Sequence, residues 1–87
     1  MNPVEEPIKP FNLSDKTLKK GDTGDDVKAL QDALKTAGFD CGTSDGDFGI
    51  KNKRAVRALQ STKTNLVIDG VFGTDTRDYL IEILNQK

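Results

Sequence analysis

The sequence predicts an all-α fold, a compact three-helix bundle made of helix-turn pseudo-repeats and long glycine-rich loops, preceded by an extended N-terminal arm. Two internal repeats predict it. Residues 45–49 (DGDFG) recur at an offset of 24 residues as 69–73 (DGVFG), and each copy runs into a helix-like stretch. Residues 27–31 (VKALQ) are echoed by 56–60 (VRALQ), which adds a third similar helix. Repeats of this length are typical of helix-plus-turn units that share one core, an architecture suited to binding.

The length and charge of the chain limit what it can do. Its 87 residues suffice for one domain with a thin core. The formal net charge of -1 argues against a nucleic-acid partner, because such binding needs many Lys and Arg side chains to neutralise phosphates. The absence of His removes the commonest general base and the commonest zinc ligand. We therefore expect no metal and no cofactor.

Residues 1–16 are predicted to form a Pro-rich linker or arm, and residues 17–87 the folded domain. The first segment carries all three prolines together with acidic side chains, a composition that cannot bury enough surface to fold alone. Three apolar residues indicate that its second half lies along the domain: Ile8, Phe11 and Leu13. The sequence has no signal peptide and no segment of membrane-spanning length. We therefore expect no membrane partner and synthesis in the cytoplasm, or else a fragment of an exported protein.

The first helix is expected to begin at Thr23, whose hydroxyl can cap the first turn, with Asp25 and Asp26 favourable beside the positive end of the helix dipole. Its apolar residues fall at spacings of three and four and form one stripe: Val27, Leu30, Leu34 and Ala37. Gly38 follows the last of them and predicts a left-handed stop, after which Phe39 can fold back on the last turn.

A glycine-marked loop over residues 40–49 leads to a second helix over about 50–61, whose inward residues are predicted to be Ala55, Val56 and Leu59. A short connection over 62–68, with an extended pair at its end (Val67 and Ile68), leads to a third helix over about 74–85. The apolar face of this helix is broader than one stripe, since Ile81 lies nearly opposite the others. The arm, a second copy of the chain or a neighbouring domain could cover it.

The two Asp-Gly corners admit a structural and a metal-binding interpretation. An EF-hand calcium loop needs a glutamate at its twelfth position, and Val56 stands there. The favoured interpretation is that each Asp accepts backbone amides while a Phe fills the core, which makes these residues a structural motif: Asp45, Gly46, Phe48, Gly49, Asp69, Gly70, Phe72 and Gly73. Gln31 and Gln60 are interpreted as inward amides that fix loop backbone, in preference to sugar contacts. The single cysteine, Cys41, is expected to be a small buried apolar side chain.

No catalytic residue is predicted. Asp45 with Asp47, or Asp25 with Asp26, would need to face one another across a cleft large enough for a sugar to act as a glycosidase pair. A repeat array of this size has little volume for such a cleft. We therefore do not expect the chain to be an enzyme.

An ordered series of motifs resembles a known family. It runs from residues 18–34 (LKKGDTGDDVKALQDAL) through 38–39 (GF), the first Asp-Gly corner and 55–60 (AVRALQ) to 66–73 (LVIDGVFG). Together these motifs resemble the peptidoglycan-binding domain-like family, the three-helix module attached to bacterial and phage cell-wall hydrolases. The resemblance covers roughly residues 18–84. It departs from the usual family pattern at four positions: Asn52, Leu59, Arg77 and Tyr79.

The resemblance implies non-catalytic binding of cell-wall peptidoglycan, which would target an attached cell-wall hydrolase, such as a phage endolysin, to its substrate. The expected ligand-binding residues lie around one mouth between the first Asp-Gly loop and the start of the third helix: Asp47, Lys51, Asn52, Arg77 and Tyr79. The basic stretch 51–57 is either a solvated face or a contact for wall carboxylates and phosphates. Because the chain has no Trp, recognition is expected to use charge and hydrogen bonds, which favours the peptide portion of the wall. The alternative is a protein interaction or oligomerisation module that associates through the third helix.

Overall fold

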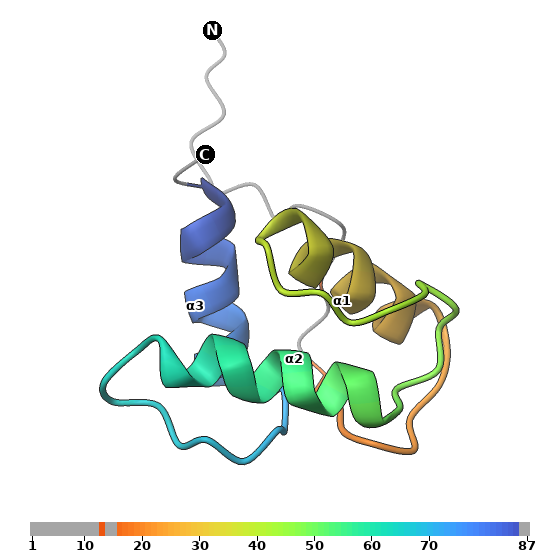
Figure 1. The fold of residues 1–87 in the computed structure, drawn as a ribbon, viewed down its shortest axis with the longest axis horizontal. Helices are drawn as coiled ribbons and strands as arrows, with labels where there is room; N and C mark the ends of the chain where they lie inside the picture. The colour runs from red at the N-terminus through yellow and green to blue at the C-terminus, as the bar shows by residue number, and fades with distance from the viewer. Residues whose placement is uncertain (1–12, 14–15, 86–87) are drawn as a thin grey trace, which may run out of the picture.

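The computed structural model describes Leu13 and residues 16–85, and it consists of three helices joined by long loops (Figure 1). The helices are α1 (Asp25–Thr36), α2 (Ile50–Ser61) and α3 (Thr74–Asn85), and each packs against the other two. Between the described residues there are two isolated β-bridges and no strand. The predicted all-α three-helix fold is therefore confirmed. None of the helices in this part of the chain has the length and apolarity needed to cross a membrane.

The start of α1 differs from the prediction. The helix begins at Asp25, and Gly24 occupies the N-cap position without a side-chain cap hydrogen bond. Thr23 instead forms an antiparallel bridge with Asp47. The prediction of Thr23 as a capping residue is wrong, because the backbone at this position pairs with a distant loop. Asp25 and Asp26 do lie in the first turn, where carboxylates favour the positive end of the helix dipole.

The end of α1 matches the prediction. Gly38 has a φ of +98°, a conformation that residues with a Cβ rarely adopt. Its amide donates to the Lys35 carbonyl over 3.0 Å, and the Phe39 amide donates to the Leu34 carbonyl over 2.8 Å. These bonds satisfy carbonyls at the end of the helix that would otherwise lack partners. Phe39 is half-buried and packs against the core, so the predicted fold-back is confirmed.

The core lies where the three helices meet, and both corner phenylalanines fill it. Phe48 and Phe72 are each 1% exposed, the largest side chains that are fully buried. The inward residues predicted for α2 are buried as well. Leu13 also belongs to the core, as predicted for the second half of the arm, whereas Ile8 and Phe11 lie outside the described residues.

The apolar side chains of α3 are already packed. Leu80 is fully buried, while Ile81, Ile83 and Leu84 are half-buried against the core. Large apolar side chains that are exposed in the described part of the chain lie elsewhere, at Ile50, Val67 and Ile68. Neither Val67 nor Ile68 takes part in a bridge, so the predicted extended pair joins no sheet.

The segment just before α1 ties both Asp-Gly corners to the rest of the domain. Leu18 exchanges two backbone hydrogen bonds with Phe72, of 3.0 and 2.8 Å. Gly21 donates to the Phe48 carbonyl over 3.0 Å, and the Gly24 amide donates to the Gly46 carbonyl over 2.8 Å. The sequence carries no short-range signal for this pairing, because its partners lie in loops far along the chain.

Candidate functional site

The first Asp-Gly corner is built around the side chain of Gln31, which reaches from α1 into the loop. Its Oε1 accepts the Gly46 amide over 2.8 Å. Its Nε2 lies within hydrogen-bond distance of three acceptors: Asp45 Oδ1 at 3.2 Å, the Asp47 carbonyl at 3.1 Å and Asn52 Oδ1 at 3.2 Å. A single buried amide thus fixes the loop, which is the arrangement predicted for an inward glutamine.

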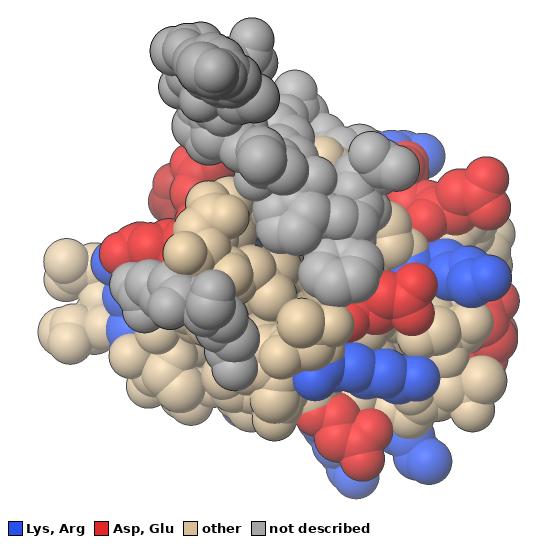
Figure 2. Space-filling model, turned by 90° about the horizontal axis from the view of Figure 1, so that it is seen from above, with Lys and Arg blue, Asp and Glu red and all other residues tan. Residues whose placement is uncertain are grey.

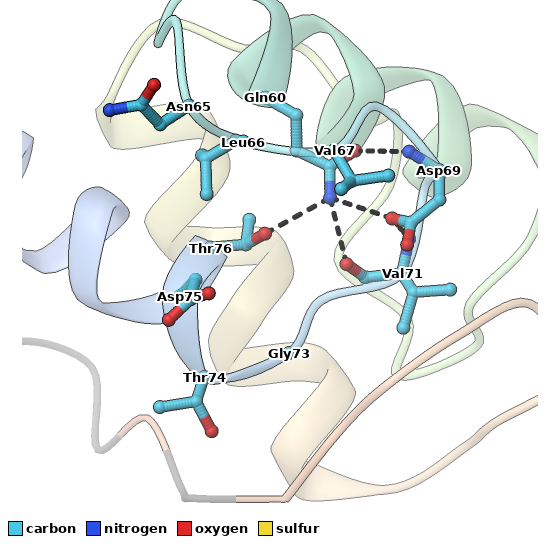
Figure 3. Close-up of a pocket in the computed structure, with 10 residues that line it drawn as sticks. All are labelled: Gln60, Asn65, Leu66, Val67, Asp69, Val71, Gly73, Thr74, Asp75 and Thr76. Carbon is cyan, nitrogen blue, oxygen red and sulfur yellow. Dashed lines mark hydrogen bonds between the residues drawn. The ribbon is translucent and has the colours of Figure 1, made fainter.

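The second corner repeats this arrangement around Gln60 of α2 (Figure 3). Gln60 Oε1 accepts the amides of Asp69 and Gly70, each over 3.0 Å. Its Nε2 lies within hydrogen-bond distance of three acceptors: Asp69 Oδ1 at 3.0 Å, the Val71 carbonyl at 3.0 Å and Thr76 Oγ1 at 3.1 Å. The repeat in the sequence is therefore also a repeat of hydrogen bonds, with Asn52 in the first copy in the place of Thr76 in the second.

The two corner aspartates accept loop amides in the same way. Asp45 Oδ1 accepts the Asp47 amide over 2.9 Å, and Asp69 Oδ1 accepts the Val71 amide over 2.9 Å. These backbone hydrogen bonds, with help from the glutamine amides, lower the pKa of both carboxyls below the ordinary value of 3.8. Each carboxylate is thus already engaged in holding its own turn.

This geometry predicts that the domain loses stability in acid. Each lowered pKa contributes stability that is present above pH 3.8 and is lost as the pH falls through the folded pKa. We expect Asp69→Asn to unfold at lower denaturant concentration than the wild type at neutral pH, and to show a shallower loss between about pH 4 and pH 2. Urea unfolding across this range measures both. Asp32→Asn, which removes a carboxylate from the middle of α1 outside the corners, should stay close to the wild-type stability at neutral pH, and an unchanged slope for Asp69→Asn would contradict the assignment.

A groove lies between the first corner and the start of α2, and we call it the first groove. It has a volume of about 290 Å³ and is lined by Cys41, Thr43, Asp45, Asp47, Gly49, Ile50, Lys51 and Asn52. Lys51 lies across the loop at Gly42, where a Cβ would come within 3.0 Å of the lysine Cδ. Among the described residues, the Lys51 ammonium has no ion-pair partner. The groove therefore offers a cation to an incoming group.

Three of the five predicted ligand residues meet in this groove, but one of them has a structural task. Asp47 and Lys51 are exposed. Asn52 is only 3% exposed, and its Oδ1 accepts the Gly49 amide over 2.9 Å as well as the Gln31 amide. Asn52 thus closes the first turn of α2 and forms the floor of the groove.

Tyr79 and Arg77 do not join these residues, so the predicted common mouth is not formed. The Tyr79 hydroxyl lies 2.6 Å from Thr62 Oγ1, and Lys63 Nζ lies 5.1 Å from the ring centroid, both beyond the C-terminal end of α2. At 1.5 Å per residue this end is about 16 Å from Lys51. Arg77 is 12% exposed and forms an ion pair of 3.3 Å with Asp78. Tyr79 and Arg77 lie apart from the first groove because α3 packs across the C-terminal half of α2 (Figure 1).

A second groove lies beside the second corner, and the sequence analysis did not predict it. Its volume is also about 290 Å³, and its lining is drawn in Figure 3: Gln60, Asn65, Leu66, Val67, Asp69, Val71, Gly73, Thr74, Asp75 and Thr76. Applying the repeat offset of 24 residues to Asp47, Lys51 and Asn52 would have pointed to Val71, Asp75 and Thr76 in this groove.

The described residues provide no metal site and no exposed thiol. No three carboxylate or thiol side chains among them gather closely enough to hold a metal ion. Cys41 is buried, its thiol lies 3.4 Å from the Gln31 carbonyl as a donor, and burial raises the pKa of the thiol. A thiol held in its protonated form is a poor nucleophile.

Known proteins are similar to this chain in sequence and in fold. Residues 23–80 match the family described as "Putative peptidoglycan binding domain". The N-acetylmuramoyl-L-alanine amidase CwlL of Bacillus licheniformis is 41% identical over 72 residues, which make up 80% of this chain and 20% of the amidase. A spore cortex-lytic enzyme of Oceanobacillus iheyensis is 36% identical over 77 residues, or 88% of this chain and 28% of that enzyme. The chain thus spans less than a third of these relatives.

The structural comparison agrees with the sequence comparison. The crystal structure of the SleB N-terminal domain superposes with a TM-score of 0.76 at 35% sequence identity, and the match covers 83% of this chain and 97% of that one. In the two enzymes the match covers 20% and 28% of the length, so most of each enzyme lies outside the region that is similar to this chain. On its repeated corners, its three helices and these similarities, the chain belongs to the peptidoglycan-binding domain family of cell-wall hydrolases.

Proposed function

We propose that this chain binds bacterial peptidoglycan without cutting it, and that it holds an attached hydrolase, such as a phage endolysin made in the cytoplasm, on the cell wall. The observation that carries this proposal is the first groove, where Lys51, which has no ion-pair partner among the described residues, and exposed polar side chains lie on a hydrogen-bonded corner. The domain belongs to a family that also occurs in cell-wall hydrolases. Tethering of this kind is useful even at weak affinity, because it raises the local concentration of the enzyme on an insoluble substrate.

The chemistry of the first groove favours the peptide part of the wall as the ligand. Lys51 can pair with a carboxylate, while the exposed Thr43 hydroxyl and the Asp47 carboxylate can bind amide and hydroxyl groups. Sugar rings are commonly bound on flat aromatic faces, and no aromatic side chain lines this groove. Ile50, which is 52% exposed, adds an apolar edge to the groove.

Self-association through α3 is a weaker candidate. Its motivation is the broad apolar face of this helix, and Ile81, Ile83 and Leu84 already pack against the core. Light scattering at several concentrations separates the candidates, because a stable dimer would support association, and a monomer that binds sacculi would support wall binding.

Reversing the charge of Lys51 tests the proposed function. We expect Lys51→Glu to weaken retention on purified insoluble sacculi about tenfold, because an attraction to wall carboxylates becomes a repulsion of similar size. A pull-down over a range of sacculus concentrations measures the affinity. Lys28→Glu, which makes the same change at an exposed position on α1 outside both grooves, is the matched control.

Two results would contradict the proposal. No retention of the wild type on any type of sacculus would remove the function and leave the fold untouched. Equal losses for Lys51→Glu and Lys28→Glu would show that net charge, and not the first groove, governs retention.

A further inference from the structure

The two grooves are copies of one another, although they differ in charge. Shifting the eight lining residues of the first groove by the repeat offset gives eight of the ten residues that line the second, from 41 and 65 at one end to 52 and 76 at the other; the second groove adds Gln60 and Leu66. Each has a volume of about 290 Å³ and rests on a buried glutamine that fixes its loop. The fold thus presents the same hollow twice.

The charge at the edge of the groove has opposite signs in the two copies. Lys51 in the first groove is replaced by Asp75 in the second, and Asp47 is replaced by Val71. The second groove contains Asp69 and Asp75 and no Lys or Arg among its lining residues. Asp75 is exposed, and its carboxylate has no ion-pair or hydrogen-bond partner among the described residues. In Figure 3 its side chain lies between those of Thr74 and Thr76.

An exposed apolar side chain stands at each groove. Ile50 lines the first and Val67, which is 72% exposed, lines the second, with Ile68 next to it. These three are the large apolar residues that are exposed in the described part of the chain. Each groove therefore has an apolar edge beside its polar lining.

From these observations we propose that the second groove is a second binding subsite, which takes a primary ammonium group of the wall polymer while the first groove takes a carboxylate. This inference rests on the proposed function. Asp75 pairs with the ammonium, the Asn65 side chain lines the same hollow and can accept a hydrogen bond, and Val67 packs on the aliphatic stem. Two weak contacts on one polymer reinforce one another, because the second forms at a high effective concentration.

Chemical blocking of wall amines tests the subsite. We expect acetylation of the amines of purified sacculi to weaken binding of the wild-type chain about three- to fivefold, the size of an exposed ion pair. Asp75→Asn should show the same loss on untreated sacculi and no further loss on acetylated ones. Asp26→Asn is the matched control, because it removes a carboxylate from the second position of α1 just as Asp75→Asn does in α3, and Asp26 lines neither groove.

A second variant and a second preparation complete the experiment. Val67→Ser trims the apolar edge without touching a charge or a buried contact, and it should weaken binding to both kinds of sacculi. The ammonium could come from a diamino acid of the wall peptides or from amines on attached polymers. Sacculi stripped of attached polymers retain the sensitivity to acetylation in the first case and lose it in the second.

The outcomes separate this inference from the proposed function. If the wild type is retained on sacculi and Asp75→Asn binds as tightly and remains as sensitive to acetylation, the second groove is no subsite, while wall binding stands. If the wild type is not retained at all, both fail. Circular dichroism of each variant shows that a loss of binding is not a loss of fold.

Discussion

Replacing Phe72 with alanine is expected to lower the free energy of unfolding by about 3–5 kcal/mol, because a fully buried aromatic ring is removed and the surrounding core cannot close the space. A domain of 87 residues with a thin core is expected near the lower end of the about 5–15 kcal/mol that proteins have in total, so this change removes much of its stability. Phe72 also carries the backbone bridge to Leu18. Loss of its ring therefore loosens the segment that precedes α1 as well.

Urea unfolding of Phe72→Ala followed by far-ultraviolet circular dichroism measures this loss. Val67→Ala, an apolar truncation in the same connection at an exposed position, is the control and should change the free energy of unfolding by less than about 0.5 kcal/mol. Similar losses for the two variants would show that the corner phenylalanine does not anchor the core.

Replacing Gln60 with leucine is expected to cost about 3 kcal/mol or more, although the two side chains have nearly the same volume. The amides of Asp69 and Gly70 would lose their shared acceptor, and the Val71 carbonyl would lose a donor. Each polar group left buried and unpaired costs about 1–3 kcal/mol, and the solvent-facing members of the loop can recover part of this from water. The second groove would lose its fixed wall at the same time.

Gln60→Glu separates the lost hydrogen bonds from a change of shape. The introduced carboxyl keeps an acceptor for the two amides but places a second negative charge beside Asp69. The repulsion raises the pKa of the introduced carboxyl in the folded state. The variant should therefore be unstable at neutral pH and should regain stability, relative to Gln60→Leu, as the pH falls and this carboxyl becomes a donor. If the difference in the free energy of unfolding between the two variants is the same at all pH values, the proposed role of the amide is contradicted.

Most of the fold could be predicted because the signals are local and repeated. Gly38 stops α1, and the Asp-Gly corners fix the starts of α2 and α3 at the predicted residues. The error at Thr23 has a physical cause, since its local preference for capping was outweighed by a bridge to Asp47 that no short-range pattern encodes.

The site was predictable only in part, for a related reason. Asp47, Lys51 and Asn52 are close in sequence, and the end of the loop and the first turn of α2 bring them together. Placing Tyr79 beside them required knowledge of which end of α2 meets α3, and the apolar pattern of a helix gives its buried face but not its crossing point. The burial of Asn52 follows from its bond to Gly49, whereas the sequence shows only a polar residue near a helix start.

The bridge between Leu18 and Phe72 also constrains how the chain folds as it leaves the ribosome. The hydrogen bonds within α1 and α2 are local, so these helices can form early, but Leu18 remains without its backbone partner until the second corner has been synthesised and has emerged. The backbone edge at Leu18 therefore stays unpaired until the chain has grown by at least the 54 residues that separate it from Phe72.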